Sequence, residues 1–247
     1  MDEIEALIDL WGRSDRVVAL TGAGTSTDSG IPDFRGPNGL WTRNPGAAAM
    51  FDIGTYIEDE EVRRRAWEGR RSHPAWAARP NAGHVALTRL QRVGRLGPVL
   101  TQNIDGLHQS AGSVDVVELH GTIWEVECLD CGQRTPTQET LARPEPDPRC
   151  LACGGILKTA TISFGQHLDP AVIDAAIEAA RRADLLVAIG TTLTVMPAAG
   201  LADMARHLAI VNADPTPYDE QADVVVREPI GDILPGIADA LTETLGS

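Results

Sequence analysis

The chain is almost without lysine and is poor in aromatic residues. Lys158 is the sole lysine among 247 residues, so arginine supplies nearly all of the positive charge. Phenylalanine, tryptophan and tyrosine make up only 4% of the chain, so alanine, valine, leucine and isoleucine must build the core. The hydrophobic content of 43% is nevertheless high enough for a sizeable core, and this composition excludes extended disorder.

A surplus of positive charge and a long apolar run are also missing. The formal net charge of −14 argues against stable binding to nucleic acid or to anionic membranes, because such binding needs clustered cations. An acidic surface suits a basic partner such as a lysine-rich peptide, although solubility alone accounts for it. No apolar run approaches the ~18 residues of a membrane span, and no signal-peptide pattern opens the chain. We expect a cytoplasmic protein without a membrane partner, and the sequence does not indicate its oligomeric state.

Cysteine is scarce, but its four positions are regularly spaced. Cys128 and Cys131 form one C-x2-C pair, and Cys150 and Cys153 form a second pair after a spacer of 18 residues. In an intracellular chain this spacing indicates a structural zinc site, with a redox pair or free thiols as the alternatives. Four thiolates complete a tetrahedron around Zn²⁺, so no position remains for a catalytic water and the metal would stabilise the fold.

A glycine-rich turn follows the first strongly apolar segment. Residues 16–20 predict a buried strand, and the turn Gly22-Ala23-Gly24-Thr25-Ser26 comes next. Glycine allows backbone N–H groups to approach a pyrophosphate, so this arrangement is typical of nucleotide-binding units. The dehydrogenase fingerprint is incomplete, because Thr27 replaces its third glycine and the acidic residue about 20 positions further on is missing. A purely structural turn is the alternative.

Apolar strands alternate with helical segments along most of the chain. Strands are predicted at 16–20, 97–101, 114–119, 184–189, 208–211 and 223–227, and helices at 2–11, 81–93, 170–183, 197–207 and 230–245. This rhythm predicts an α/β fold, a Rossmann-like parallel sheet with helices on both faces. Two segments interrupt it, a helical insertion with a charged helix at 58–71 and the segment that holds the cysteines.

Two domains and a cleft follow from these interruptions. We predict a Rossmann-like domain from residues 1–36, 80–121 and 158–247, and a small domain from the helical insertion 37–79 and the zinc-binding module 122–157. The cleft between them is the expected ligand site. Arginines 63–65 in the insertion are expected to form a solvated helix face.

Polar or glycine residues directly follow five of the predicted strands. These clusters are Gly22 to Ser26, Asn103 to Asp105, His120, Gly190 to Thr192, and Asn212 to Asp214. Open α/β sheets bind ligands at the carboxyl ends of their strands, so we expect the clusters to lie together. His120 is the only one of the six histidines that ends a strand at this edge, and a neutral imidazole suits a general base. A structural histidine and a capped turn at Asn103 to Asp105 are the alternatives.

In this order, these stretches resemble the sirtuin family of NAD-dependent protein lysine deacylases. The matching segments span nearly the whole chain: Gly22 to Ser26, Gly30 to Gly36, Thr101 to His108, His120-Gly121, the four cysteines, Phe164-Gly165, Gly190 to Leu193 and Val211-Asn212. The resemblance implies a bacterial-type enzyme with one structural Zn²⁺ that consumes NAD as a co-substrate. Nicotinamide would leave, and the acyl group of an acylated lysine in a protein or peptide would end on ADP-ribose.

The resemblance also implies roles for individual residues. His120 would be the base that acts on a ribose hydroxyl, Asn103 would position the ribose and a water, and Asp105 would bind the nicotinamide carboxamide. NAD would also contact Gly22, Ala23, Gly24, Ser26, Asp33, Phe34, Arg35, Trp41, Gln102, Ile104, Gly190, Thr191, Thr192, Asn212, Ala213, Asp214 and Ile230. The substrate peptide would lie between Phe164-Gly165 and Val195, held by backbone hydrogen bonds.

The chain departs from the family pattern on the substrate side. Gln166 stands where the family has glutamate, and Trp67-Glu68-Gly69-Arg70 is the nearest match to the Tyr-x-x-Arg of deacylases that prefer acidic acyl groups. Arg70 could bind an acyl carboxylate, but Trp67 lacks the phenol, so acetyl is the favoured acyl group. The alternatives are a deacylase for acidic or longer acyl groups, a mono-ADP-ribosyltransferase or NAD hydrolase on the same scaffold, and a non-catalytic NAD-binding module.

Overall fold

A six-stranded parallel sheet forms the centre of the molecule, in the order β3-β2-β1-β7-β8-β9. The computed structural model describes residues 2–34, 36, 39–43 and 51–243. The strands are β1 (Val17–Thr21), β2 (Val99–Thr101), β3 (Val116–Glu118), β7 (Leu185–Ile189), β8 (His207–Val211) and β9 (Val224–Val226). Strand β1 pairs with both β2 and β7, and all its residues are buried, as expected for a central parallel strand.

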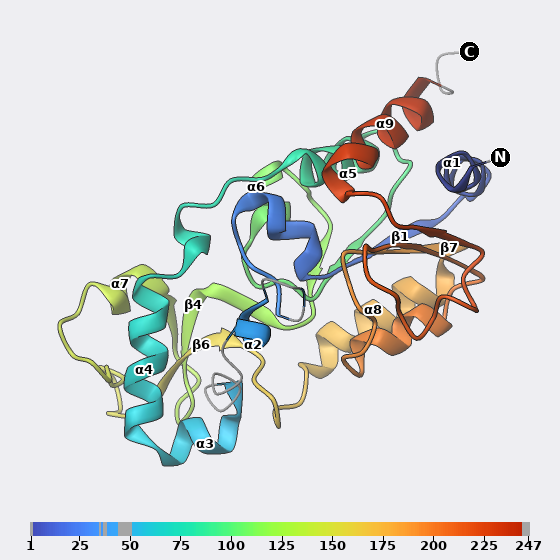
Figure 1. Cartoon of the computed structure of the whole chain (residues 1–247). Coiled ribbons are helices and arrows are strands. Elements are labelled where there is room, and N and C mark those ends of the chain that lie inside the picture. Colours follow the sequence, from blue (N-terminus) through green and yellow to red (C-terminus); the bar gives the residue numbers. More distant parts are fainter. Residues whose placement is uncertain (1, 35, 37–38, 44–50, 244–247) are drawn as a thin grey trace.

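Helices cover both faces of this sheet, which confirms the predicted fold class. Figure 1 shows α5 (Ala82–Arg92) and α9 (Ile230–Glu243) on one side of β1 and β7, and α8 (Pro170–Arg182) on the other. Helix α1 (Glu3–Gly12) packs on the α5 and α9 side. Successive strand residues point to opposite faces, so Val17 and Ala19 join one core while Val18 and Leu20 join the other. In the described part of the chain, no helix is both long and apolar enough to cross a membrane.

Local capping fixes several of the predicted helix starts. Asp2 caps α1 in a capping box with Glu5, and the Asn81 side chain accepts hydrogen bonds from two backbone N–H groups of α5. The predicted helix at 197–207 is wrong in type and length, because the chain forms a short 3₁₀ helix, Ala198–Asp203, and β8 already begins at His207. The sequence analysis also missed the short helix α6 (Leu107–Ala111).

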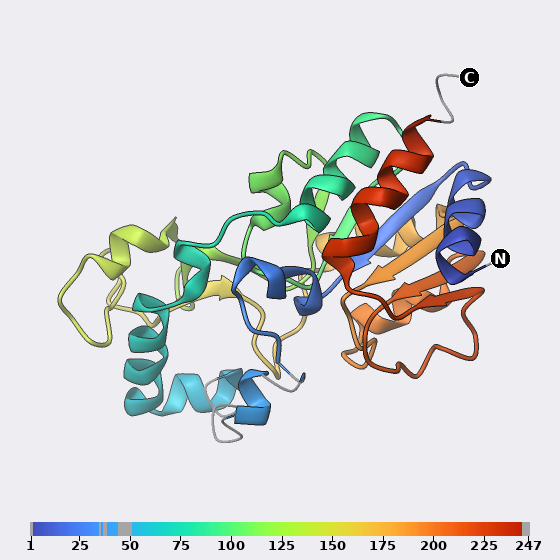
Figure 2. The same cartoon turned by 45° about the horizontal axis from the view of Figure 1, so that its top comes forward.

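A second, antiparallel sheet lies beside the first and carries the cysteines. Its order is β5-β4-β6, with β4 (Gly121–Cys128), β5 (Arg134–Pro136) and β6 (Leu157–Thr161). Helix α7 (Thr137–Leu141) follows β5. Figure 2 shows this unit and the helices α3 (Ile53–Glu58) and α4 (Glu60–Arg71) together, away from the parallel sheet. The break between α3 and α4 falls at Asp59, whose side chain caps α4.

The helical insertion packs directly on the cysteine-containing unit. The Tyr56 hydroxyl donates to the Leu157 carbonyl at 2.7 Å, and Arg63 pairs with Asp147 at 3.0 Å. Both side chains of the Arg63–Asp147 pair are buried, with 5% and 6% exposure. The expectation of a solvated arginine face is therefore wrong for Arg63, although Arg64 and Arg65 are exposed. The helical insertion and the cysteine-containing unit thus contact each other, and the division of the chain into a Rossmann-like domain and a small domain stays a prediction.

The buried pair predicts a specific loss of stability. Asp147→Leu leaves the Arg63 guanidinium buried without a carboxylate, so the free energy of unfolding should fall by about 3 kcal/mol or more. Arg64→Met on the same helix breaks only an exposed pair with Glu60 and should change it by less than about 1 kcal/mol. Urea unfolding followed by circular dichroism measures both values, and equal losses in the two variants would contradict the assignment.

Candidate active site

One cleft of about 600 Å³ collects the strand ends of the parallel sheet and the facing surface of the insertion and β6. The predicted catalytic and NAD residues that line it are Gly22, Ala23, Gly24, Ser26, Asp33, Phe34, Gln102, Asn103, Ile104, Asp105, His120, Gly190, Thr191, Thr192, Asn212 and Asp214. The predicted substrate residues Trp67, Arg70, Phe164, Gly165 and Val195 line the same cleft. Residues from segments far apart in the sequence thus meet at one site, as the strand-end argument predicts.

Four predicted cofactor residues are not placed in the cleft. Ala213 is exposed and does not line it, and Ile230, at the start of α9, packs against the core on the α5 side. Arg35 and the side chain of Trp41 lie outside the part of the chain that the structure describes. Contacts of these four residues with NAD therefore stay predictions.

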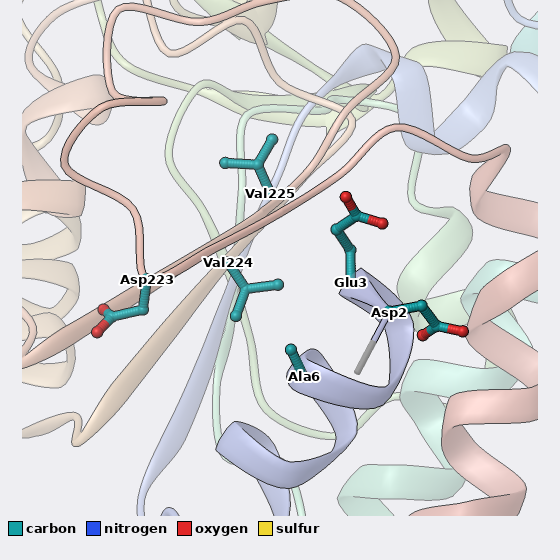
Figure 3. A pocket seen from close by; sticks show the side chains of 6 residues that line it. All are labelled: Asp2, Glu3, Ala6, Asp223, Val224 and Val225. Carbon is teal, nitrogen blue, oxygen red and sulfur yellow. The ribbon is translucent and has the colours of Figure 1, made fainter.

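A smaller hollow of about 260 Å³ lies elsewhere, between α1 and β9 (Figure 3). Its lining consists of Asp2, Glu3, Ala6, Asp223, Val224 and Val225. Asp223 immediately precedes β9, so this hollow is at the amino ends of the strands. Its three carboxylates would repel a pyrophosphate, which leaves the large cleft as the candidate site.

Glycines allow the turns after β1 and β7 to touch. The Gly24 N–H donates to the Gly190 carbonyl at 2.9 Å, and a Cβ on Gly24 would lie 2.9 Å from the Gly190 Cα. Gly190 has φ +62°, and a Cβ there would lie 2.4 Å from the Thr25 nitrogen. The glycine-rich turn therefore has a structural role, as its alternative interpretation holds, and its specific partner is the turn after β7.

A network of side chains links the segments that follow β1 and β2. Asn103 donates through Nδ2 to the Gly22 carbonyl and to Ser26 Oγ, both at 3.1 Å. Ser26 in turn donates to Asp105 Oδ2 at 2.7 Å, while Asp105 Oδ1 accepts from the Leu107 N–H at 2.9 Å. Asp105 Oδ1 therefore caps the turn, as the alternative interpretation of a capped turn predicts, while Asp105 Oδ2 belongs to the hydrogen-bond network in the cleft.

His120 is held in one tautomer. Its Nδ1 lies 3.0 Å from the Gln102 carbonyl, which can only accept, so Nδ1 carries the proton and the neutral ring has its lone pair on Nε2. Burial lowers the pKa of His120 below its ordinary value, and the hydrogen bond to Gln102 opposes this shift in part. The imidazole is therefore neutral at pH 7, as a general base must be.

Two buried histidines beside the cleft were missed by the sequence analysis. The rings of His84 and His108 lie 4.8 Å apart and are almost inaccessible. His84 Nδ1 is 3.0 Å from Asn81 Oδ1, and His108 Nε2 is 3.0 Å from the Thr21 hydroxyl. Burial lowers the pKa of His84 to about 4 and that of His108 to about 3. Nothing in the local sequence signals that these two histidines pair.

Hydrogen-bond donors dominate the cleft wall formed by α4 and β6. Arg70 Nε donates to Thr159 Oγ1 at 3.3 Å, and Lys158 Nζ donates to the carbonyls of Thr159 and Thr161. Burial, and secondly the charge of Arg70, lowers the pKa of Lys158 to about 8. The indole N–H of Trp67 is buried and has no acceptor among the described residues. This wall is electropositive although the chain as a whole is acidic.

In the predicted peptide-binding segment Phe164-Gly165, the backbone of Phe164 is already paired with the helical insertion. The Phe164 N–H donates to the Phe51 carbonyl at 2.7 Å, and the Phe164 carbonyl accepts from the Ile53 N–H at 3.0 Å. In the described part of the chain, no backbone group pairs with Gly165. Gln166 Oε1 accepts from the Ser163 N–H at 2.9 Å, so an amide oxygen caps this turn without the negative charge of a glutamate. Backbone pairing with a peptide would therefore fall on Gly165 rather than on Phe164.

The four cysteines form a cluster that fits Zn²⁺. All four sulfurs lie within 4.8 Å of one another, and the Sγ atoms of Cys128 and Cys153 are 3.5 Å apart. Tetrahedral Zn–S bonds of about 2.3 Å place sulfurs about 3.8 Å apart, close to these distances. Each C-x2-C turn is closed by a backbone bond, from Gly132 to Cys128 and from Gly154 to Cys150. None of the four lines the cleft, which agrees with a structural metal.

The parallel sheet with its ligand cleft defines the chain as a nucleotide-binding α/β protein, and comparisons identify the family. The profile of the Sir2 family matches residues 22–197. NAD-dependent protein deacetylase 2 of Streptomyces coelicolor is 53% identical over 90% of this chain and 95% of its own length. The NAD-dependent protein deacetylase of Rhodopseudomonas palustris is 42% identical over 94% of each chain.

Solved structures agree with the sequence comparisons. A Sir2 homologue in complex with NAD has a TM-score of 0.88 at 34% identity, over 99% of this chain and 95% of its own. A Sir2 variant with a deacetylated p53 peptide and 3′-O-acetyl-ADP-ribose has a TM-score of 0.87 at 34% identity, over 98% of each chain. The chain belongs to the Sir2 family.

The buried histidine pair predicts a loss of stability in mild acid. An unfolded histidine titrates near pH 6.5, so between about pH 6.5 and pH 4 the unfolded chain binds protons that folded His84 and His108 do not. The free energy of unfolding should therefore fall as the pH drops through this window, by up to about 1.4 kcal/mol per pH unit for each histidine.

Urea unfolding at a series of pH values between 7 and 5 tests this prediction. His108→Gln should flatten the pH dependence, because it removes one of the two titrating groups. The matched control His167→Gln changes an exposed histidine and should keep the wild-type slope. Identical slopes in both variants would show that the buried pair does not cause the effect.

Proposed function

We propose that the chain is an NAD-dependent protein lysine deacetylase, which transfers the acetyl group of an acetyl-lysine to ADP-ribose and releases nicotinamide. The observation that carries this proposal is His120, which is held in one tautomer with Nε2 available, in the cleft that Asn103 and Asp105 also line. The curated relatives named above are NAD-dependent protein deacetylases. The related complex with a deacetylated peptide and an acetylated ADP-ribose matches the proposed products.

Asn103, Asp105 and His120 each keep an acceptor atom available for the reaction. When bound, NAD supplies an electrophilic ribose carbon once nicotinamide leaves. Asn103 uses its Nδ2 within the protein, so Oδ1 remains to accept from a ribose hydroxyl or a water. Both Asp105 oxygens have a second lone pair that can accept from the nicotinamide carboxamide. His120 Nε2 removes the proton from a ribose hydroxyl, which makes that oxygen the nucleophile toward the acyl carbon.

The remaining residues of the site bind the phosphates and the adenosine ribose of NAD, the zinc ion and the substrate peptide. The turns that contain Ser26 and Thr191 offer hydroxyl and backbone N–H donors for the phosphates, and Asn212 and Asp214 bind the adenosine ribose. The four cysteines hold one Zn²⁺, which stabilises the small domain without a catalytic role. An acylated protein segment binds along Gly165, opposite Val195. We place the enzyme in the cytoplasm, and the acidic net charge argues against a nucleic-acid or anionic-membrane partner.

Acidic acyl groups form a second substrate class, supported by the wall of Arg70, Lys158 and Trp67. Neither cation has a carboxylate within ion-pair distance among the described residues, and the Trp67 N–H has no acceptor. Burial lowers the pKa of the Arg70 guanidinium below its ordinary value, and the nearby Tyr56 opposes this shift in part. A carboxylate at the end of an acyl chain, as in succinyl-lysine, would supply the missing counterion.

The deacetylase proposal predicts a peptide-dependent release of nicotinamide. Incubation with NAD and an acetyl-lysine peptide should yield one nicotinamide for each deacetylated peptide, measured by chromatography and peptide mass. His120→Ala should lower kcat by about 10²–10⁴-fold, because the general base is lost. His167→Ala is the matched control and should keep wild-type activity. ADP-ribose found on protein in place of O-acetyl-ADP-ribose would favour the transferase alternative, and no peptide-dependent release would contradict both.

The electropositive wall predicts which variants discriminate between acyl groups. Arg70→Met should lower kcat/KM for a succinyl-lysine peptide by about tenfold or more relative to that for the acetyl-lysine peptide, because a charge-assisted hydrogen bond is lost. Lys158→Met should act in the same direction, whereas Arg65→Met on the exposed face of α4 should leave the ratio unchanged. An equal loss for both peptides in Arg70→Met would assign this residue to the fold rather than to the acyl group.

A further inference from the structure

Arg227 directly follows β9, and its side chain binds the backbone of the loop that comes after β8. Its Nη1 donates to the Asn212 carbonyl at 2.8 Å and to the Asp214 carbonyl at 2.7 Å. Its Nη2 pairs with Asp219. The described lining of the cleft includes Asn212 and Asp214 but neither Arg227 nor Asp219.

The Arg227 side chain supplies hydrogen bonds between the two segments at the point where the backbone hydrogen bonds between β8 and β9 end. Strands β8 and β9 pair up to Val211 and Val226, and the Asn212 N–H makes the last backbone bond, to the Val226 carbonyl at 3.1 Å. Beyond this point the strands separate, and the chain from Asn212 to Asp223 contains no helix or strand. Arg227 then supplies the next two bonds through its side chain, to the carbonyls of Asn212 and Asp214. The Asn212 Nδ2 also donates to the Asp214 carbonyl at 2.8 Å, so the Asn212 side chain is part of the same arrangement.

Asp219 fixes the orientation of the guanidinium. Its Oδ2 binds Arg227, and its Oδ1 accepts from the Thr216 hydroxyl at 2.8 Å. The loop thus closes on itself through Asp219, Arg227 and the two carbonyls. Because Asp219 neutralises Arg227, the pair contributes little net attraction for a distant phosphate, and its effect on a ligand must come through the position of the loop.

We propose that Arg227 is a positioning residue for the adenosine half of NAD. By holding the carbonyls of Asn212 and Asp214, it fixes the backbone of the loop that brings these two residues to the cleft before NAD binds, and the bond from Asn212 Nδ2 to the Asp214 carbonyl leaves Asn212 Oδ1 available to accept from a ligand. A preorganised loop binds more tightly than one that must be ordered on binding. The inference rests on the proposed function, since only that proposal assigns Asn212 and Asp214 to the adenosine ribose.

Binding of ADP-ribose, measured by isothermal titration calorimetry, tests the proposal together with NAD kinetics. Arg227→Met should weaken ADP-ribose about tenfold and raise KM for NAD similarly, with kcat at saturating NAD within about twofold of wild type. Arg227→Lys should recover only part of the loss, because an ammonium lacks the planar fork that spans two carbonyls and Asp219. Arg206→Met, an exposed arginine beside β8, is the control and should bind as wild type does.

Asp219→Asn separates positioning from simple charge attraction. It makes the protein less acidic, so a direct electrostatic role for Arg227 predicts unchanged or tighter ADP-ribose binding, and that result would overturn the proposal. Positioning predicts weaker binding, because the guanidinium is no longer anchored. Equal affinity of wild type and Arg227→Met would overturn this inference alone, whereas a wild-type protein that does not bind ADP-ribose would overturn the proposed function with it.

Discussion

The contact between the turns after β1 and β7 is the constraint on which the site depends. Gly24 donates to the Gly190 carbonyl, and a Cβ on either glycine would clash with the backbone of the other turn. With the turns in contact, the residues that directly follow β2 can reach both of them: Asn103 binds the Gly22 carbonyl, and Gln102 Nε2 donates to Thr191 Oγ1 at 2.9 Å. A side chain at either glycine would separate the groups that these bonds join.

His120, the proposed catalytic base, depends on the same contact through two hydrogen bonds of one residue. Gln102 donates through its side chain to Thr191, and its carbonyl lies 3.0 Å from His120 Nδ1, so Gln102 connects the turn after β7 to His120. The substrate side is tied to the helical insertion instead, because Phe164 pairs with Phe51 and Ile53. In the proposed function, the parallel sheet would therefore position NAD, and the segment tied to the helical insertion would position the acylated peptide.

Features that depend on local sequence could be predicted, and those that depend on distant partners could not. Buried strands, the Asn81 cap and the paired cysteines follow from nearby residues, and parallel topology brings the strand-end clusters together. Arg63 looked like a surface residue because its partner Asp147 is 84 residues away. His84 and His108 pair only after α5 and α6 pack. Ala213 and Ile230 do not line the cleft, because Ala213 lies exposed in the loop after β8 and Ile230 packs against the core from the start of α9.

The burial of Lys158 limits the acylation of the protein itself. Lys158 is the sole lysine, and its side chain is 5% exposed inside the cleft. Acyl thioesters and acyl phosphates modify exposed lysine amines wherever they meet them, and the surface of this protein offers none. A catalyst that removes acyl groups from lysine thus has no exposed side chain on which the same modification could accumulate.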